Sequence, residues 1–329
     1  MIKTVLTGIV ALLLFIACDR DQEEISVTKD LVSGPVPKTS LDEFSGQKAY
    51  DHIVKLTSFG PRPPKSEGYE KSLKYLEAIM KEYGWATKRS SFQATTPVGK
   101  ISFTNLIARY QPEGEPDWTN SPKFVIGGHL DSKPYSDKVF LGVNDSGSST
   151  GVMLEIARVL AKNPAAALNV EFVFFDGEEA MLEDMTYELD GPRRTIRRQD
   201  GLYGSTNYAK RLAKRRKKPS LAFVLDLIGD SKVPLFVGGD SNPRAIAHSK
   251  RAVETLGLQK IVKFPRTSVL DDHVPLIVFA NLPVLHLIGD FQSMPYWHKK
   301  GDTLDKISPE ALGNAGKLTL QVLHQLTNQ

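Results

Sequence analysis

Apolar runs of strand length alternate with segments of helical periodicity along most of the chain. The five strand-like runs are KISFTNLIARY (100–110), KFVIGGHL (123–130), NVEFVFF (169–175), SLAFVLDLI (220–228) and LPVLHLIG (282–289). Most of their positions are apolar, without strict alternation, as expected of strands buried on both faces. The pattern predicts an α/β fold with a mostly parallel, twisted central sheet covered by helices on both faces.

Two segments show the helical period clearly. In GYEKSLKYLEAIMKEYGW (68–85) apolar residues recur at helical spacing, and Gly84 is placed to end the helix. The segment SSTGVMLEIARVLAKN (148–163) collects Val152, Ile156 and Val159 on one face. No internal repeat and no second linker interrupts the pattern, which favours a single catalytic domain over residues 41–329.

The first eighteen residues differ from the rest of the chain. Lys3 precedes the apolar run VLTGIVALLLFIA, which ends directly before Cys18, the only cysteine. The run is short for a membrane span and has the layout of a signal peptide. A small residue followed by cysteine resembles the bacterial lipoprotein processing site, although Phe15 stands where leucine is usual. We expect residues 1–18 to direct export to the bacterial periplasm or cell envelope and residues 19–40 to form a polar tether. Cys18 is then either a lipidated membrane anchor or an incidental cysteine.

Composition and charge add little to this picture. The 41 % apolar and 24 % charged fractions are ordinary for a soluble globular protein, and the net charge is only +4. The basic run YAKRLAKRRKKPS (208–220) is interpreted as a solvated helix with cations in its last turn, because no aromatic platform accompanies it in the sequence. We therefore expect no nucleic-acid partner, and a monomer.

Hard oxygen and imidazole groups follow several of the predicted strands. They occur in HLD (129–131), GVND (142–145), DGEE (176–179), Asp226 within LDLIG, and YWH (296–298). In open sheets of this kind, ligands bind beyond the carboxyl ends of the strands. Several carboxylates in one cleft repel one another unless a cation offsets their charge. Carboxylate and imidazole ligands together point to zinc, and an open coordination position would make the site catalytic.

Taken singly, each of these residues is more simply read as a turn or surface residue, and only their combination favours a metal. The neighbours Glu178 and Glu179 point in different directions on an extended segment, so one can bind the metal while the other faces the substrate. His286 lies within an apolar strand and is interpreted as a core residue, whereas His273 stays ambiguous. A serine hydrolase is disfavoured because no G-x-S-x-G motif occurs.

A family resemblance rests on motifs that span the region from about residue 45 to the C-terminus. They are FFDGEEA (174–180), LYGS (202–205), LDLIG (225–229), DDHVP (271–275), PVLHLI (283–288) and the pair Trp297-His298. In this ordered set the chain resembles the zinc aminopeptidase superfamily and, within it, the animal-type glutaminyl-peptide cyclotransferases, as a bacterial member.

The resemblance implies a role for each matching residue. One zinc ion would be held by Asp145, Glu179 and His298, and Glu178 would be the general acid/base. Asp226 and Asp271 would belong to a hydrogen-bonded network beside the reacting amide, and Trp297 would wall the pocket.

The implied reaction converts N-terminal glutamine of peptides and exported proteins to pyroglutamate with release of ammonia. The alternative is a two-metal aminopeptidase in which His129 and Asp226 complete a second site. The chain also departs from the animal members. Asp184 stands where they carry a tryptophan, and the segment 181–201 is longer, with Tyr187 as a candidate for the missing aromatic surface.

Overall fold

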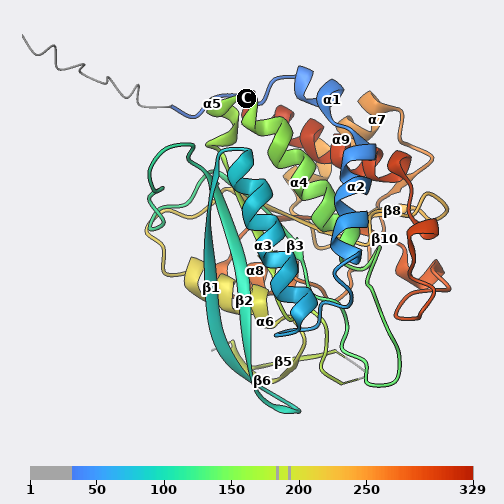
Figure 1. The fold of residues 1–329 in the computed structure, drawn as a ribbon. Helices are drawn as coiled ribbons and strands as arrows, with labels where there is room; N and C mark the ends of the chain where they lie inside the picture. Colours follow the sequence, from blue (N-terminus) through green and yellow to red (C-terminus); the bar gives the residue numbers. More distant parts are fainter. Residues whose placement is uncertain (1–31, 183–184, 192–193, 329) are drawn as a thin grey trace, which may run out of the picture. The chain divides into compact units, whose positions relative to one another are not determined.

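A computed structural model describes residues 32–182, 185–191 and 194–328, which belong to one compact unit, Leu31–Gln329 (Figure 1). The predicted signal segment, residues 19–31 of the predicted tether, and Asp184 lie outside the described residues. Packing begins at residue 34, since the Gly34 amide donates to the Ala165 carbonyl at 2.8 Å and Val36 is fully buried. Within the described ranges, no helix has both the length and the apolarity needed to cross a membrane.

Eight of the described strands form one sheet in the order β1-β2-β4-β3-β7-β10-β8-β9. The four central strands β4, β3, β7 and β10 are mutually parallel, and antiparallel pairs join β1 to β2, β2 to β4 and β10 to β8. The predicted fold class is thus confirmed. The strands are β1 (Trp85–Thr96), β2 (Gly99–Tyr110), β3 (Phe124–His129), β4 (Val170–Phe175), β7 (Leu221–Asp226), β8 (Leu235–Val237), β9 (Val262–Lys263) and β10 (Val284–Gly289).

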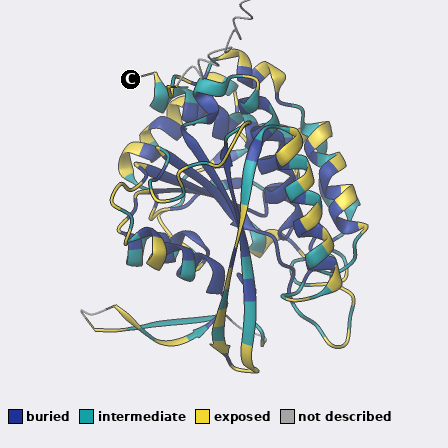
Figure 2. Cartoon of the chain, turned by 60° about the vertical axis from the view of Figure 1, so that its left-hand side comes forward, coloured by how far each residue is buried: buried dark blue, intermediate teal, exposed yellow. Residues whose placement is uncertain are grey.

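Helices cover both faces of this sheet, and the central strands are buried along their whole length (Figure 2). The helices are α1 (Thr39–Glu43), α2 (Gly46–Thr57), α3 (Glu67–Glu82), α4 (Gly147–Ala161), α5 (Pro164–Ala167), α6 (Tyr203–Leu212), α7 (Pro243–Leu256), α8 (His273–Ala280) and α9 (Pro309–Thr327). The larger apolar core lies between the sheet and the layer of α2, α4 and α9. A smaller core lies under α6 and α8 on the other face.

The long segment after the paired glutamates forms its own small sheet. The strands β5 (Thr186–Asp190) and β6 (Thr195–Asp200) pair as an antiparallel hairpin separate from the main sheet (Figure 1). Tyr187 packs edge-on against Phe279 of α8, with ring centroids 6.3 Å apart. Its ring is therefore partly engaged with that helix.

The parallel arrangement of β4, β3, β7 and β10 brings their carboxyl ends to one edge of the sheet. At the end of β4 the chain turns through Gly177, whose φ of +71° favours glycine. A Cβ atom at Gly177 would also lie 2.4 Å from the Phe103 ring. This turn directs Glu178 and Glu179 back over the edge formed by the neighbouring strands.

Candidate metal centre and active site

The structure brings the three residues expected to bind zinc into one cluster. His298 Nε2 lies 3.4 Å from Asp145 Oδ2 and 3.3 Å from Glu179 Oε2. Asp145 and Glu179 are buried, whereas His298 retains 24 % of its side-chain exposure. Asp145 comes from the loop before α4, Glu179 from the turn after β4, and His298 from the loop after β10.

These spacings fit a tetrahedral metal ion. Ligands held about 2.0–2.1 Å from zinc at tetrahedral angles lie roughly 3.3–3.4 Å from one another. Glu179 Oε1 is buried without a hydrogen-bond partner, as expected of an oxygen whose charge a cation offsets. Burial alone would lower the pKa of His298, but Glu179 and Asp145 raise it to about 10. The buried Lys133 Nζ, 3.7 Å from Glu179 Oε2, offsets part of the negative charge, and the donor set of the cluster suits zinc.

A second cluster shares Asp145 with the first. His129 Nε2, at the end of β3, lies 3.2 Å from Asp145 Oδ1 and 3.2 Å from Asp226 Oδ1. The three residues are buried and close enough to hold another ion. The separation from Asp226 also lies at the outer range of a direct hydrogen bond, so a single N–H at Nε2 can pair with that carboxylate without an ion. The geometry thus keeps open both the one-metal and the two-metal interpretation of the sequence.

Glu178 lies between these clusters and the adjoining carboxylates. Its side chain is 9 % exposed, and Oε2 is 4.0 Å from His129 Nδ1. Burial raises the pKa of Glu178 well above its ordinary value; His129 opposes this effect, and Glu179 and Asp271 add to it. A carboxyl group whose pKa is raised by burial is a candidate general acid/base.

Two buried carboxylates to which the sequence analysis assigned no role hold the site residues in place, although Asp131 belongs to the strand-end segment HLD (129–131). The Asp131 carboxylate accepts the backbone amides of Glu178 and Glu179, each at 3.2 Å. The Asp302 carboxylate accepts those of Asn144 at 2.8 Å and Asp145 at 3.2 Å. The pairs His129-x-Asp131 and His298-x₃-Asp302 are the only sequence signals for these supports.

Arg62 holds the loop after β3 and the loop before α4 through hydrogen bonds. Its fully buried guanidinium donates to the carbonyls of Leu130, Leu141 and Gly142 at 2.7–2.9 Å, and to Ser146 Oγ at 3.2 Å. These acceptors flank the loop that carries Asp145, so the arginine fixes the position of that ligand.

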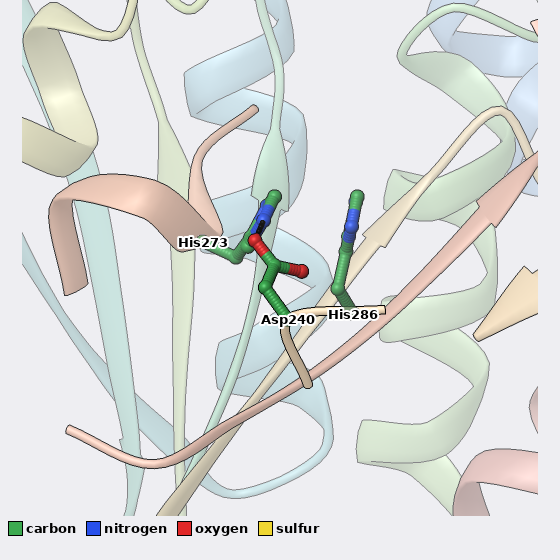
Figure 3. Close-up of side chains that lie close together, drawn as sticks. All are labelled: Asp240, His273 and His286. Atoms are coloured by element: carbon green, nitrogen blue, oxygen red, sulfur yellow. Dashed lines mark hydrogen bonds and ion pairs between the residues drawn. The ribbon is translucent and has the colours of Figure 1, made fainter. Parts of the chain in front are cut away.

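A line of acids and imidazoles extends from the site toward the surface. His286 Nε2 lies 2.6 Å from Asp271 Oδ2, and the His286 ring stacks on His273 with centroids 3.9 Å apart. His273 Nε2 in turn lies 2.7 Å from Asp240 Oδ2, and the Asp240 carboxylate faces that ring in Figure 3. His286 is buried, as interpreted from the sequence, but it contacts a predicted site residue. Because the two rings are nearly parallel, their nitrogen lone pairs do not converge on one point, so this group suits a metal less well than the first cluster.

Trp297 lies beside the first cluster. The Trp297 ring stacks on the His298 ring, with centroids 4.1 Å apart and an interplanar angle of 24°. The Phe291 ring lies on Trp297 as well, with a centroid distance of 4.7 Å. The His298 carbonyl accepts from Tyr135 Oη and Lys138 Nζ, both at 3.0 Å. These contacts support a left-handed backbone at His298, whose φ is +54°.

A mostly parallel sheet with carboxylates and imidazoles gathered at its carboxyl edge defines an α/β protein with a candidate metal centre where such folds bind their ligands. Residues 105–323 match the model of peptidase family M28. A glutaminyl-peptide cyclotransferase-like protein of Bos taurus is 30 % identical over 335 residues, which cover 90 % of this chain and 82 % of the relative. The chain therefore belongs to peptidase family M28, in its glutaminyl-peptide cyclotransferase branch, which confirms the resemblance seen in the motifs.

Solved structures agree with this assignment. A glutaminyl cyclase from an Acidobacteriales bacterium superposes with a TM-score of 0.73 and 29 % identity, covering 87 % of this chain and 96 % of its own. A Zn-dependent exopeptidase from Parabacteroides distasonis has a TM-score of 0.72 at 24 % identity, with 88 % and 99 % covered, and shares the fold.

Proposed function

We propose that this protein is a zinc-dependent glutaminyl-peptide cyclotransferase acting on peptides and proteins with N-terminal glutamine. The observation that carries the proposal is the convergence of Asp145, Glu179 and His298 at ligand spacing, with Glu178 buried beside them. Membership of the cyclotransferase branch supports the choice of substrate. In the proposed reaction the α-amino nitrogen bonds to the γ-amide carbon, the carbon–nitrogen bond of that amide breaks, and ammonia leaves a pyroglutamyl peptide.

Zinc, when bound, would supply a Lewis acid that polarises the γ-carbonyl of the glutamine. The remaining work falls to the protein. Glu178 takes a proton from the attacking nitrogen and returns it to the departing ammonia. Asp271, held by His286, orients the leaving group, and Asp226 completes the network beside the amide. Trp297 offers a planar wall to the flat side-chain amide.

Ring closure suits a site with one metal ion. The α-amine has an ordinary pKa of about 7.7–8.0, so a useful fraction is neutral and nucleophilic near pH 7. The amine belongs to the same residue as the carbon that it attacks. The reaction is therefore intramolecular, and little translational and rotational entropy is lost in bringing the two groups together. No separate water has to be activated, and we propose one zinc per chain on this ground.

The second candidate function is a two-metal aminopeptidase. The cluster of His129, Asp145 and Asp226 favours it, because a second ion there would share Asp145 with the first. The two functions differ in nucleophile, since the peptidase must activate water whereas the cyclase uses the substrate's own amine.

One experiment separates these functions. The purified protein is incubated with a Gln-initiated and a Leu-initiated peptide, and both are followed by mass spectrometry. Loss of ammonia from the first peptide with the second untouched is the expected result. Release of free leucine would establish the peptidase instead, and a mass change in neither would refute both.

We also propose that the protein is exported, attached to a membrane through Cys18, and monomeric. The apolar run before the only cysteine supports export and attachment at Cys18. After a wash at high salt, which removes attachment by charge alone, Cys18→Ser should be found in the soluble fraction of the host envelope, whereas the unchanged protein should stay with the membrane. A protein that stays in the membrane fraction after this change is not held by a lipid on Cys18.

A further inference from the structure

Exposed cations lie in or beside two neighbouring grooves, and five of them are here called the basic edge: Lys88, Lys123, Lys214, Arg216 and Lys217. Four of the five lie in the segments directly before the amino ends of β3 or β7, whereas Lys88 pairs with Ile107 and is level with Val173 in the middle of β4. Arg211 and Arg244 line the grooves as well. One groove, of about 500 Å³, is lined by Lys88, Lys214 and Arg216. A second, of about 460 Å³, is lined by Lys123. The segments that carry them run side by side, because the Ser220 amide donates to the Lys123 carbonyl at 2.7 Å.

The cations of the basic edge make no direct ion pairs within the described ranges. None of the five cations forms an ion pair with a carboxylate of the described residues. The acids of the adjoining loop are engaged within it: Asp117 accepts the backbone amide and hydroxyl of Thr119, and Glu115 accepts the indole N–H of Trp118 at 3.2 Å. The five cations therefore have no direct carboxylate partner in the part of the chain that the structure describes and remain available to an anionic one, while the charges of Asp117 and Glu115 offset part of the local potential.

An aromatic ring lies within this charge. Trp118 lines the first groove, with Lys88 Nζ 5.6 Å and the Arg109 guanidinium 5.2 Å from its ring. The sequence interpretation of the basic run as a solvated helix rested on the lack of such a ring nearby. The helix α6 in fact ends at Leu212, so most of the run is loop, and the loop after β2 brings Trp118 to it. An amphipathic indole beside cations is typical of residues at membrane–water interfaces.

The chain enters the domain at the same edge. Asn169 Nδ2 donates to the Gly34 carbonyl at 2.6 Å, and the Asn169 carbonyl accepts the Phe124 amide at 2.8 Å. Gly34 is thus two hydrogen bonds from the residue that follows Lys123. Cys18 precedes Gly34 by 16 residues, so the connecting segment reaches at most about 55 Å.

The candidate active site lies at the other end of the same strands. Phe124 begins β3 and His129 ends it, and this length corresponds to about 16 Å of extended chain. A surface pressed against the amino edge would leave the carboxyl edge open to solvent.

We propose that the basic edge is a membrane-facing surface that binds the anionic headgroups of a phospholipid bilayer. Lys88, Lys123 and Lys214 make electrostatic contacts with the headgroups, and Trp118 sits at their level. The bilayer then holds the domain by the edge at which the chain enters and directs the active site toward the aqueous compartment. The inference does not depend on cyclase activity or on lipidation of Cys18.

The test uses the full chain carrying Cys18→Ser, so that no lipid is attached. Partitioning is measured by co-sedimentation with vesicles of phosphatidylcholine alone and of phosphatidylcholine mixed with phosphatidylglycerol. The neutral vesicles report any binding by the apolar residues before Cys18. The ratio of the two partition coefficients isolates the electrostatic part, which should fall as salt is added.

The decisive variant replaces Lys88, Lys123 and Lys214 with glutamine. Its matched control replaces Lys65, Lys100 and Lys232, three exposed lysines at the carboxyl edge, and loses the same net charge. Each surface cation contributes about fivefold, so the first variant should lose the anionic preference on the order of a hundredfold, while the control loses little. The thermal midpoint by circular dichroism checks that both are folded.

Three outcomes would overturn the proposal. The first is that the Cys18→Ser chain with all its lysines shows no preference for anionic vesicles. The second is that the two triple variants lose the preference equally, which would assign the effect to net charge alone. A single-stranded oligonucleotide that displaces the protein from vesicles, and binds it more tightly than they do at equal salt, would assign the surface to nucleic acid.

Discussion

Asp271 Oδ2 lies 2.6 Å from His286 Nε2, and both side chains are buried. Burial alone would raise the pKa of Asp271, but the contact with His286 outweighs it and lowers the pKa to about 2. The imidazole thus keeps a carboxylate ionised in a region where burial and neighbouring acids oppose its charge. Through this contact, a strand histidine controls a residue assigned to the leaving group.

The first prediction follows from that contact. In His286→Phe, Asp271 loses the neighbour that depresses its pKa, so the pKa rises and the carboxylate is protonated at higher pH. The acid limb of kcat/KM should move to higher pH by about one to three pH units, the range expected for losing a close opposite charge. His52→Phe is the control, because it removes another buried imidazole, whose Nδ1 lies 2.6 Å from Tyr75 Oη rather than beside a site carboxylate. An acid limb that does not move would disconnect Asp271 from the reaction.

The second prediction separates the neighbouring glutamates. Glu178→Gln removes the proton carrier but leaves Asp145, Glu179 and His298 intact. It should retain zinc and lose about 10²–10⁴-fold in kcat, as expected for loss of a general acid/base. Glu179→Ala should instead release the metal, because it removes one of three protein ligands. Zinc content by elemental analysis and turnover of a Gln-initiated peptide check both variants. Wild-type turnover in Glu178→Gln would exclude its role as proton carrier.

The third prediction concerns Arg62, whose guanidinium is fully buried under the loops of the site. Arg62→Met leaves the carbonyls of Leu130, Leu141 and Gly142 without these donors and removes a cation near Asp131 and Asp302. The loss should be about 3–5 kcal/mol in the free energy of unfolding, measured by denaturant titration.

Two controls define the cause of that loss. Arg62→Lys keeps the charge without the planar fork and should fall between wild type and Arg62→Met. Arg197→Met breaks only the exposed pair with Glu188 and should change stability by less than about 0.5 kcal/mol. If Arg62→Met unfolded at the same denaturant concentration as wild type, the buried network would not stabilise the fold.

The sequence predicts those features that depend on residues close together along the chain. The central strands are apolar along their length, and His129, Glu178, Glu179 and Asp226 directly follow or end them, so a parallel sheet places them together. The strand β1 was not predicted, because its burial does not alternate regularly on this outer edge of the sheet. Asp145 and His298 lie in loops, and only their combination with the other motifs indicated a shared ligand set.

Other features depend on contacts between distant segments and leave no local pattern. Asp302 accepts amides more than 150 residues away in the chain, and Arg62 donates to carbonyls some 70–80 residues away. The pairing of His286 with Asp271 joins a strand to a loop before α8. An apolar strand containing one histidine indicates burial, and only the fold reveals which acid that histidine contacts.

The last prediction addresses the number of metal ions. His129 Nε2 lies 3.2 Å from one oxygen each of Asp145 and Asp226, and its Nδ1 lies 3.6 Å from Asp131 Oδ1. Burial would lower the pKa of His129, but Asp226 and Glu178 raise it well above its ordinary value. An imidazole that carries both protons offsets neighbouring carboxylates and offers no lone pair to a metal. We therefore predict that His129, and not a second ion, offsets the charge of Asp145 and Asp226. Wild-type protein saturated with zinc and freed of excess by gel filtration should hold one ion per chain, and His129→Gln should still hold one. Two ions in wild type and one in His129→Gln would show that His129 is a ligand, and would move the chemistry toward the two-metal peptidase.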